Sequence, residues 1–250
     1  AAVPGARAHG ARFARQAVTA GAAAVLTDPT GADLAAGCGV PVLVVPDPRA
    51  VLGEVSATVY GRPAQQLLML GVTGTNGKTT VTYLIDSALR ARGVCTGLVG
   101  TVETRVGDEH RPSVRTTPEA PDVQGLLALM AEREVQVCSM EVSSHALCLH
   151  RVDGIVFDVV AFTNLSQDHL DFHRTMADYF EAKATLSRAD RARRGVVCVD
   201  DEWGRRLAAQ AGIPVLTVAT RTPEPGTPEP DWRVVDRMPV PGGVGTDFVL

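Results

Sequence analysis

The sequence has few cysteines, no excess of basic residues and no long apolar run, and each absence excludes a class of protein. The five cysteines among the 250 residues are scattered, and no two have the spacing of metal ligands. An odd, scattered set predicts reduced thiols in the cytoplasm, not a disulfide framework or a structural zinc site. The formal net charge of −4 leaves no basic surface to neutralise nucleic-acid phosphates.

What remains is an ordinary globular composition. Hydrophobic residues make up 45% and charged residues 21% of the chain. The length indicates one large or two medium domains. No apolar run approaches the roughly 20 residues that a membrane helix needs, and no signal peptide is recognisable. We therefore expect a cytoplasmic protein with no membrane insertion, and a monomer.

The first part of the chain predicts a small α/β unit. Its apolar and helix-forming runs predict helices at 11–20 and 48–59 and buried strands at 23–26 and 42–45. Asp47 is the expected N-cap of the second helix, and Gly61-Arg62-Pro63 predicts a linker. We expect residues 1–64 to form an N-terminal domain that is incomplete at its start.

Residues 65–250 repeat this alternation on a larger scale. Apolar runs predict strands at 68–73, 96–100, 135–140, 155–162, 195–199 and 214–218, and helical patterns occupy 79–91, 120–133, 176–186 and 202–211. Such alternation predicts an α/β fold with a mostly parallel sheet covered by helices on both faces, whose ligands bind at the carboxyl ends of the strands. Residues 234–250 predict a hairpin around Pro239 to Gly245.

A glycine-rich loop links the strand at 68–73 to the helix that follows. It contains Gly74-Thr75-Asn76-Gly77-Lys78-Thr79-Thr80. Glycines let backbone N–H groups approach phosphate oxygens, and a helix N-terminus adds partial positive charge. Lys78 can reach the outer phosphates and Thr79 a magnesium ion, so the loop predicts ATP binding. Val72 stands where the general pattern has its first glycine, and an ordinary helix-capping turn is the alternative.

Two further clusters follow predicted strands. Glu141 comes at the end of the run 135–140, where a carboxylate can coordinate magnesium. A solvated glutamate is the alternative. The loop after the run 155–162 contains two carboxylates and two histidines in six residues: Asp168, His169, Asp171 and His173. This density indicates a second cation site or a nucleotide contact, and a hydrogen-bonded turn is the alternative.

Lys183 shares the apolar face of the helix at 176–186 with Tyr179 and Phe180. A snorkelling lysine is one reading of this position. The other is a partly buried amine with a lowered pKa, which can be neutral and take up CO₂ to form a carbamate. A carbamate would replace a cation with an anion suited to metal binding.

Thr116-Thr117-Pro118 precedes the helix at 120–133. Hydroxyl groups beside a helix start can bind an anionic substrate. Simple N-capping of the helix is the alternative, and it is the commoner use of such a motif.

Together these segments resemble the Mur ligases of peptidoglycan synthesis, and in particular the MurE-type branch, which adds the third residue of the stem peptide. The matching stretches follow the family's order and are 74–80, 116–119, 140–147, 163–173 and 179–183. The glycine loop is shared with folylpolyglutamate synthases. The Glu-Val-Ser-Ser-His and Asp-His-Leu-Asp stretches indicate the MurE-type branch.

The resemblance implies roles for individual residues. It places ATP on the loop residues Gly74 to Thr80 and on Asn164, and implies catalytic roles for Lys78, His169 and Lys183. It implies that Mg²⁺ is held by Thr79, Glu141, His169 and a carbamylated Lys183. It implies that UDP-MurNAc-dipeptide is gripped by Thr116, Thr117, Ser143 and Arg151, while the first domain holds the UDP end.

The resemblance therefore implies an ATP-dependent amide ligase. It would join diaminopimelate or lysine to UDP-MurNAc-L-Ala-D-Glu through an acyl phosphate. Residues 65–250 would be the central ATP-binding domain, truncated at its end, with the family's C-terminal ligase domain absent. The alternatives are a folylpolyglutamate-synthase-like ligase and an inactive nucleotide-binding fragment. Arg174 stands where the family usually has glycine, close to the expected metal loop.

Overall fold

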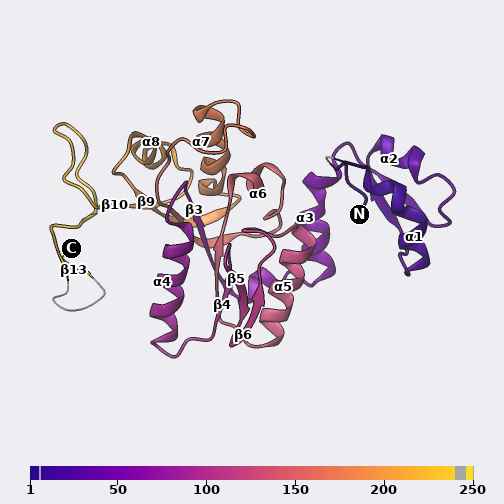
Figure 1. The fold of residues 1–250 in the computed structure, drawn as a ribbon, viewed down its shortest axis with the longest axis horizontal. Coiled ribbons are helices and arrows are strands. Elements are labelled where there is room, and N and C mark those ends of the chain that lie inside the picture. The colour runs from indigo at the N-terminus through magenta and orange to yellow at the C-terminus, as the bar shows by residue number, and fades with distance from the viewer. Residues whose placement is uncertain (6, 240–245, 250) are drawn as a thin grey trace.

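The computed structural model describes residues 1–5, 7–239 and 246–249 (Figure 1). The N-terminal unit pairs two short parallel strands, β1 (Val25–Thr27) and β2 (Val42–Val44). The predicted helix at 11–20 is a 3-10 helix, η1 (Gly10–Phe13), followed by α1 (Ala14–Thr19). A further helix, α2 (Pro29–Leu34), begins at an Asp28 cap with proline in its first turn, a start signal that the sequence does carry.

Helix α3 (Pro48–Val59) connects this unit to the rest of the chain. The Asp47 carboxylate accepts a hydrogen bond from the Arg49 N–H at 2.8 Å, so the predicted cap is confirmed. The helix packs against α5 (Ala120–Glu132). A Cβ on Gly53 would lie 2.3 Å from the Asp153 carbonyl oxygen, which shows how closely α3 approaches the larger part. A 3-10 turn, η2 (Pro63–Gln66), then leads into the main sheet.

Among the described residues the main sheet has nine strands. In spatial order they are β11 (Trp232–Arg233), β10 (Val215–Ala219), β9 (Ala192–Cys198), β8 (Phe157–Phe162), β3 (Leu68–Thr73), β7 (Val137–Glu141), β4 (Thr96–Val99), β5 (Glu103–Val106) and β6 (Glu109–Pro112). The pairings from β11 to β4 are parallel, and those of β5 and β6 are antiparallel. The mostly parallel sheet is therefore confirmed.

The predicted strands include the most buried ones of the main sheet, but the prediction that 42–45 is a buried strand is wrong, because Leu43 and Val44 of β2 are 57% and 50% exposed. All residues of β7 and β4 are buried, because central parallel strands are covered on both faces. The edge hairpin β5–β6 was not predicted. Its charged residues hide the strand pattern, although Gly107 at φ +59° supplies a turn signal between the strands.

Helices cover both faces of the sheet. Figure 1 shows α4 (Lys78–Arg90) and α5 on opposite sides of the central strands. The remaining helices are α6 (Ser144–Cys148), α7 (Met176–Ala184), which continues into the 3-10 turn η3 (Thr185–Ser187), and α8 (Glu202–Gln210). None of the described helices combines the length and apolarity needed to cross a bilayer.

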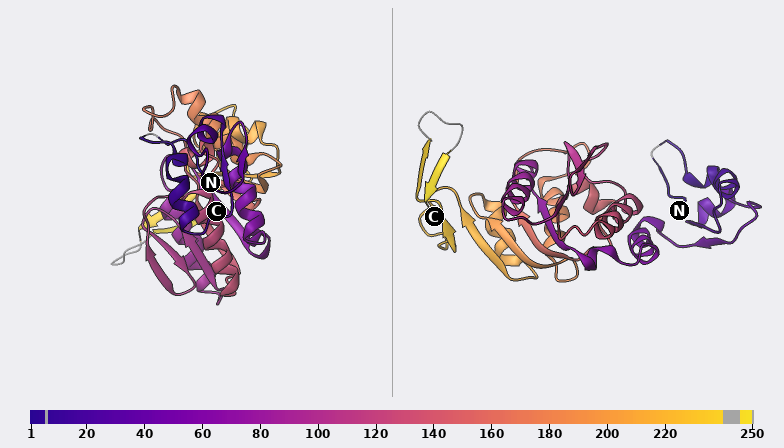
Figure 2. Two further views of the ribbon diagram at one scale, coloured as in Figure 1. Left: turned by 90° about the vertical axis from the view of Figure 1, so that its right-hand side faces the viewer. Right: turned by 90° about the horizontal axis from the view of Figure 1, so that it is seen from below.

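The two ends of the chain lie at opposite ends of the molecule (Figure 2). At the C-terminal end, β12 (Asp236–Pro239) pairs antiparallel with β13 (Thr246–Val249), as the predicted hairpin requires. The expected turn falls mostly on residues 240–245, which lie outside the described residues. All five cysteines are free thiols; Cys38 and Cys138 are buried, whereas Cys148 is exposed.

Candidate nucleotide and substrate site

The glycine loop lies between the end of β3 and the start of α4, as predicted. Gly77 is the N-cap of α4 and has φ +87°, while Gly74 has φ +142°. Both values lie where side chains are strained, so both positions favour glycine. A Cβ on Gly74 would also lie 1.9 Å from the Thr163 hydroxyl oxygen, which leaves no room for a side chain.

The segment after β8 holds this loop in shape. The Thr75 N–H donates to the Asn164 carbonyl at 2.9 Å, and the Asn76 N–H donates to the Asn164 side-chain oxygen at 3.1 Å. The Asn164 amide returns a bond to the Asn76 carbonyl at 3.1 Å. Asn164 thus lies directly against the glycine loop.

Two lysines meet at one backbone carbonyl of the loop. Lys78 Nζ donates to the Gly74 and Thr75 carbonyls at 3.0 and 2.8 Å. Lys183 Nζ reaches the same Gly74 oxygen from α7 at 2.8 Å. Burial lowers the pKa of Lys78, and the negative charges of Glu141 and Asp168 oppose that shift. The Lys78 ammonium next to the loop is a cation of the kind that binds the outer phosphates of a nucleotide.

Lys183 is buried, with an exposed fraction of 1%. Burial lowers its pKa to about 7, with a further contribution from the charge of Lys78, while Asp168 opposes the shift. Its ammonium lies 4.6 Å from the centroid of the Tyr179 ring, and the Tyr179 hydroxyl is 3.3 Å from that of Thr75. The snorkelling alternative is therefore excluded, because the amine points into the protein and away from solvent.

Glu141 is the buried carboxylate beside the loop. Its exposed fraction is 0%, so the solvated-glutamate alternative is also excluded. The Thr79 hydroxyl donates to it at 3.0 Å, and the Thr101 N–H and hydroxyl donate at 2.8 and 3.1 Å. We did not predict Thr101, although it follows a predicted strand just as Glu141 does.

The oxygens of Thr79 and Glu141 fit a divalent cation. Magnesium prefers a carboxylate or two together with phosphate oxygens and water. A hydroxyl and a carboxylate 3.0 Å apart, next to a loop shaped for phosphate, provide the protein part of such a site. Among the residues that the structure describes, no three His, Cys, Asp or Glu side chains converge as a ready-made metal cage.

His169 lies beside this site on the loop before α7. Its backbone is left-handed, with φ +51°, and its side chain is 44% exposed. Its ring is 6.2 Å from Tyr179 and 5.0 Å from His145 between centroids. His169 and Lys183 therefore approach the same Tyr179 ring, whereas Thr79, Glu141 and Lys183 have direct contacts at the glycine loop.

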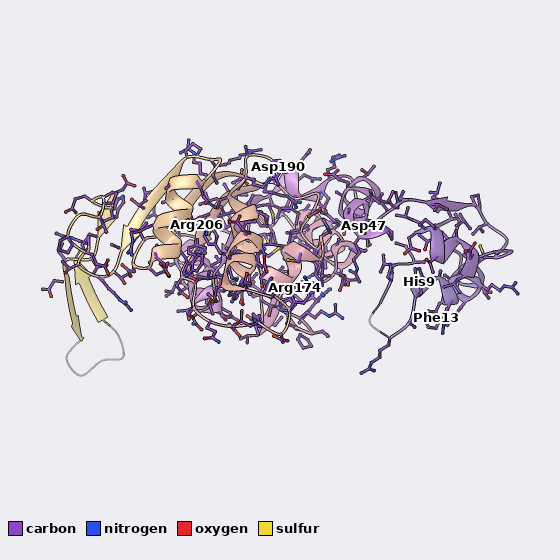
Figure 3. All side chains as sticks on the ribbon, turned by 90° about the horizontal axis from the view of Figure 1, so that it is seen from above. His9, Phe13, Asp47, Arg174, Asp190 and Arg206 are labelled. Atoms are coloured by element: carbon purple, nitrogen blue, oxygen red, sulfur yellow. The ribbon has the colours of Figure 1, made fainter. Side chains whose placement is uncertain are left out.

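Other residues of this loop are fixed by hydrogen bonds. His173 is buried, and its Nε2 is 2.9 Å from the Ser144 hydroxyl at the start of α6. Asp168 accepts the His169 N–H at 2.8 Å. The hydrogen-bonded-turn alternative therefore describes part of this segment. Arg174 is exposed beside it, just before α7 (Figure 3).

The predicted substrate residues lie next to Glu141. The Thr117 hydroxyl donates to the Glu141 carbonyl at 2.8 Å and accepts the Ser143 N–H at 3.2 Å. The Thr116 hydroxyl is 3.0 Å from that of Thr101. Helix α5 begins after Glu119 and has no side-chain cap, so these threonines do not serve as simple caps.

Arg151 completes this group from the loop after α6. One guanidinium nitrogen donates to the Thr117 carbonyl at 3.2 Å, and another lies 3.0 Å from the Glu119 carboxylate. The four residues predicted to grip substrate thus come together from three segments. Hydrogen bonds through Thr101 and Glu141 connect this group to Thr79 at the glycine loop.

Comparison with known proteins identifies the family of the chain. Residues 72–227 match the family model described as Mur ligase middle domain. The chain is 57% identical to the UDP-N-acetylmuramoyl-L-alanyl-D-glutamate--2,6-diaminopimelate ligase of Streptomyces avermitilis over 94% of this chain and 46% of that protein. It is 58% identical to the protein of the same name from Streptomyces coelicolor, over 93% and 45%. The chain thus spans about half the length of the curated relatives it matches.

Solved structures of related ligases have the same fold. A structure of a UDP-N-acetylmuramoyl-L-alanyl-D-glutamate--2,6-diaminopimelate ligase matches with a TM-score of 0.75 and 28% identity, over 91% of this chain and 45% of that one. Escherichia coli FolC, solved with DHPP and ADP, matches at 18% identity and a TM-score of 0.53, over 68% and 49%, and so shares only the fold. On the family model and the bacterial relatives together, the chain belongs to the Mur ligase family.

Proposed function

We propose that this chain is the nucleotide- and acceptor-binding part of an ATP-dependent ligase that extends UDP-MurNAc-L-Ala-D-Glu by one amino acid. One observation carries the proposal: Lys78, Lys183 and the Glu141–Thr79 pair surround a single glycine loop. The relatives at 57–58% identity are named for 2,6-diaminopimelate, which favours that amino acid over lysine.

The reaction would proceed in two steps. The acceptor carboxylate attacks the γ-phosphorus of ATP, an O–P bond forms, and ADP leaves. The amine of the incoming amino acid then attacks the acyl carbon, and phosphate leaves as the amide forms and a proton is lost. Such chemistry depends on positioning and charge neutralisation around the moving phosphoryl group. Lys78 would exchange its two carbonyl partners for phosphate oxygens.

Thr79 and Glu141 would hold Mg²⁺ in this site. The ion would neutralise charge on the phosphate oxygens as the phosphoryl group transfers. The role of Glu141 is then to keep a negative charge beside Thr79, and that of Thr101 is to fix the carboxylate by two hydrogen bonds. His169 and a modified Lys183 would serve a second ion.

We propose further that Lys183 is carbamylated. A pKa of about 7 leaves a large neutral fraction of the amine at physiological pH. The neutral nitrogen attacks CO₂, an N–C bond forms, and one proton leaves to give an anionic carbamate. Labelling with ¹³C-bicarbonate should give a carbamate NMR signal in the wild type that is missing in Lys183→Arg. The same spectrum in both proteins would refute the modification.

Thr116, Thr117, Ser143 and Arg151 would bind the acceptor next to the phosphate loop, and residues 1–64 would hold its UDP end. The direct test is calorimetric titration of this chain with UDP-MurNAc-L-Ala-D-Glu and, separately, with dihydrofolate. We expect binding of the first ligand only. Binding of dihydrofolate alone would replace this proposal with the folylpolyglutamate-synthase alternative, which the 18% identity to FolC does not favour.

The proposal assigns binding, but not turnover, to these 250 residues. Because the chain spans about half of its relatives' length, we expect little phosphate release when it is incubated with ATP and acceptor. Phosphate release at the rate of a complete ligase would show that these residues suffice for the chemistry.

A further inference from the structure

One carboxylate next to the proposed acceptor site holds three guanidinium groups. Glu119 Oε2 lies 3.1 Å from Arg49 of α3, and Oε1 lies 3.0 Å from Arg151 after α6. Arg115 also donates to Oε1 from the loop before α5. We call Arg49, Arg115 and Arg151 the arginine cluster. Its members come from three segments that are far apart in the sequence and meet only at Glu119.

The arginine cluster keeps a positive charge after Glu119 is counted. Three guanidinium groups against one carboxylate leave a formal charge of +2. Burial lowers the pKa of Arg151, and the nearby Arg115 and Arg49 lower it further, against the opposing effect of Glu119. Without Glu119 these like charges would repel one another, so the carboxylate is what allows them to lie together.

The arginine cluster has one buried donor without a partner, and one of its members, Arg115, borders an open hollow. Arg151 Nε is buried and has no hydrogen-bond partner among the residues that the structure describes. A buried N–H of this kind is costly unless a ligand or water accepts its bond. Arg115 is 51% exposed, and with Glu119 it lines a hollow of about 650 Å³.

We propose that Glu119 is a positioning residue, which holds the arginine cluster as one binding surface for an anionic group of the nucleotide-sugar acceptor. This inference rests on the proposed function. Arginine suits the task, because its planar fork binds carboxylate and phosphate oxygens in pairs. The anionic group is the acceptor's diphosphate or its carboxylate, which share this chemistry. Arg49 would thereby tie α3 to acceptor binding.

Glu119→Gln separates charge from positioning, because the two predict opposite changes in acceptor affinity. Glu119→Gln keeps the shape of the side chain but removes its charge, so the arginine cluster becomes more positive. If charge alone mattered, an anionic ligand would bind more tightly. If positioning matters, the guanidinium groups separate and binding weakens. We expect about tenfold weaker binding of UDP-MurNAc-L-Ala-D-Glu by calorimetry, partial recovery in Glu119→Asp, and unchanged ATP binding.

A matched control separates positioning from stability. Asp190 also pairs with two arginines, Arg188 and Arg191, but it does not line this hollow. Asp190→Asn should therefore lose thermal stability without weakening acceptor binding. Arg49→Gln, which leaves Glu119 in place, should weaken acceptor binding about threefold. It provides a second test if Glu119→Gln folds poorly.

The same titration with UDP alone locates the anion. Weaker UDP binding in Glu119→Gln would place the diphosphate on the arginine cluster, whereas a loss seen only with the full acceptor would place its carboxylate there. Equal or tighter binding of both ligands by Glu119→Gln would overturn the inference. If the wild-type chain binds no acceptor, the proposed function is contradicted, and this inference, which rests on it, is contradicted as well.

Discussion

The phosphate loop and the arginine cluster are both cationic, but they hold their cations differently. At the loop, Lys78 and Lys183 share a neutral partner, the Gly74 carbonyl. At the arginine cluster, three guanidinium groups share the full negative charge of Glu119. A carbonyl is a weaker partner than a carboxylate, so Lys78 can be drawn to an incoming phosphate more readily. The loop is built to exchange partners and the arginine cluster to keep its geometry.

The largest expected effect is a loss of ATP affinity at the glycine loop, with no change at the arginine cluster. Lys78→Ala removes a charge-assisted contact to the phosphates, and ATP should bind about 100-fold more weakly, a loss of ~3 kcal/mol. Acceptor binding should be unchanged, because the arginine cluster is intact. Calorimetry with each ligand measures both. Near-normal ATP affinity in this variant would show that Lys78 and the glycine loop do not bind the phosphates of ATP.

A smaller effect is expected from the loop backbone. Gly74→Ala places a Cβ against Thr163 at a φ of +142°, so it should destabilise the fold by roughly 1–3 kcal/mol and weaken ATP binding. Gly93→Ala is the matched control, because Gly93 also has a positive φ but no atom lies within 4 Å of its Cβ. If Gly74→Ala and Gly93→Ala lose the same free energy of unfolding in urea, the contact with Thr163 makes no contribution to the loss.

The smallest effect is expected at the cap of α3. Asp47→Ala removes the side chain that accepts the first N–H groups of the helix and should cost about 1 kcal/mol of unfolding free energy. Since α3 carries Arg49 to the arginine cluster, acceptor binding should weaken slightly while ATP binding stays the same. A parallel loss of ATP affinity would show that the two regions are not independent.

The two regions also differ in how well the sequence predicts them. The phosphate loop is one contiguous motif after an apolar strand, so its place, its ligand class and its buried neighbours follow from local pattern. Lys183 could be singled out because its helical spacing puts it on the apolar face with Tyr179 and Phe180.

The arginine cluster could not be predicted in this way. Its arginines are spread over three segments, and only Arg151 could be singled out from the sequence, through the family resemblance. Only the packing of α3 on α5 brings Arg49 to Glu119. The charged edge hairpin β5–β6 was missed for a related reason, because its strands lack the apolar run that identified the others.

The central claim is that Glu141 and Thr79 hold Mg²⁺ against nucleotide on the glycine loop. The most direct measurement is the ATP affinity of the chain with and without Mg²⁺, in the wild type and in Glu141→Gln. We predict that Mg²⁺ tightens ATP binding to the wild type and has little effect on the variant, because the carboxylate that holds the ion is gone. An equal Mg²⁺ effect in both proteins would contradict the account.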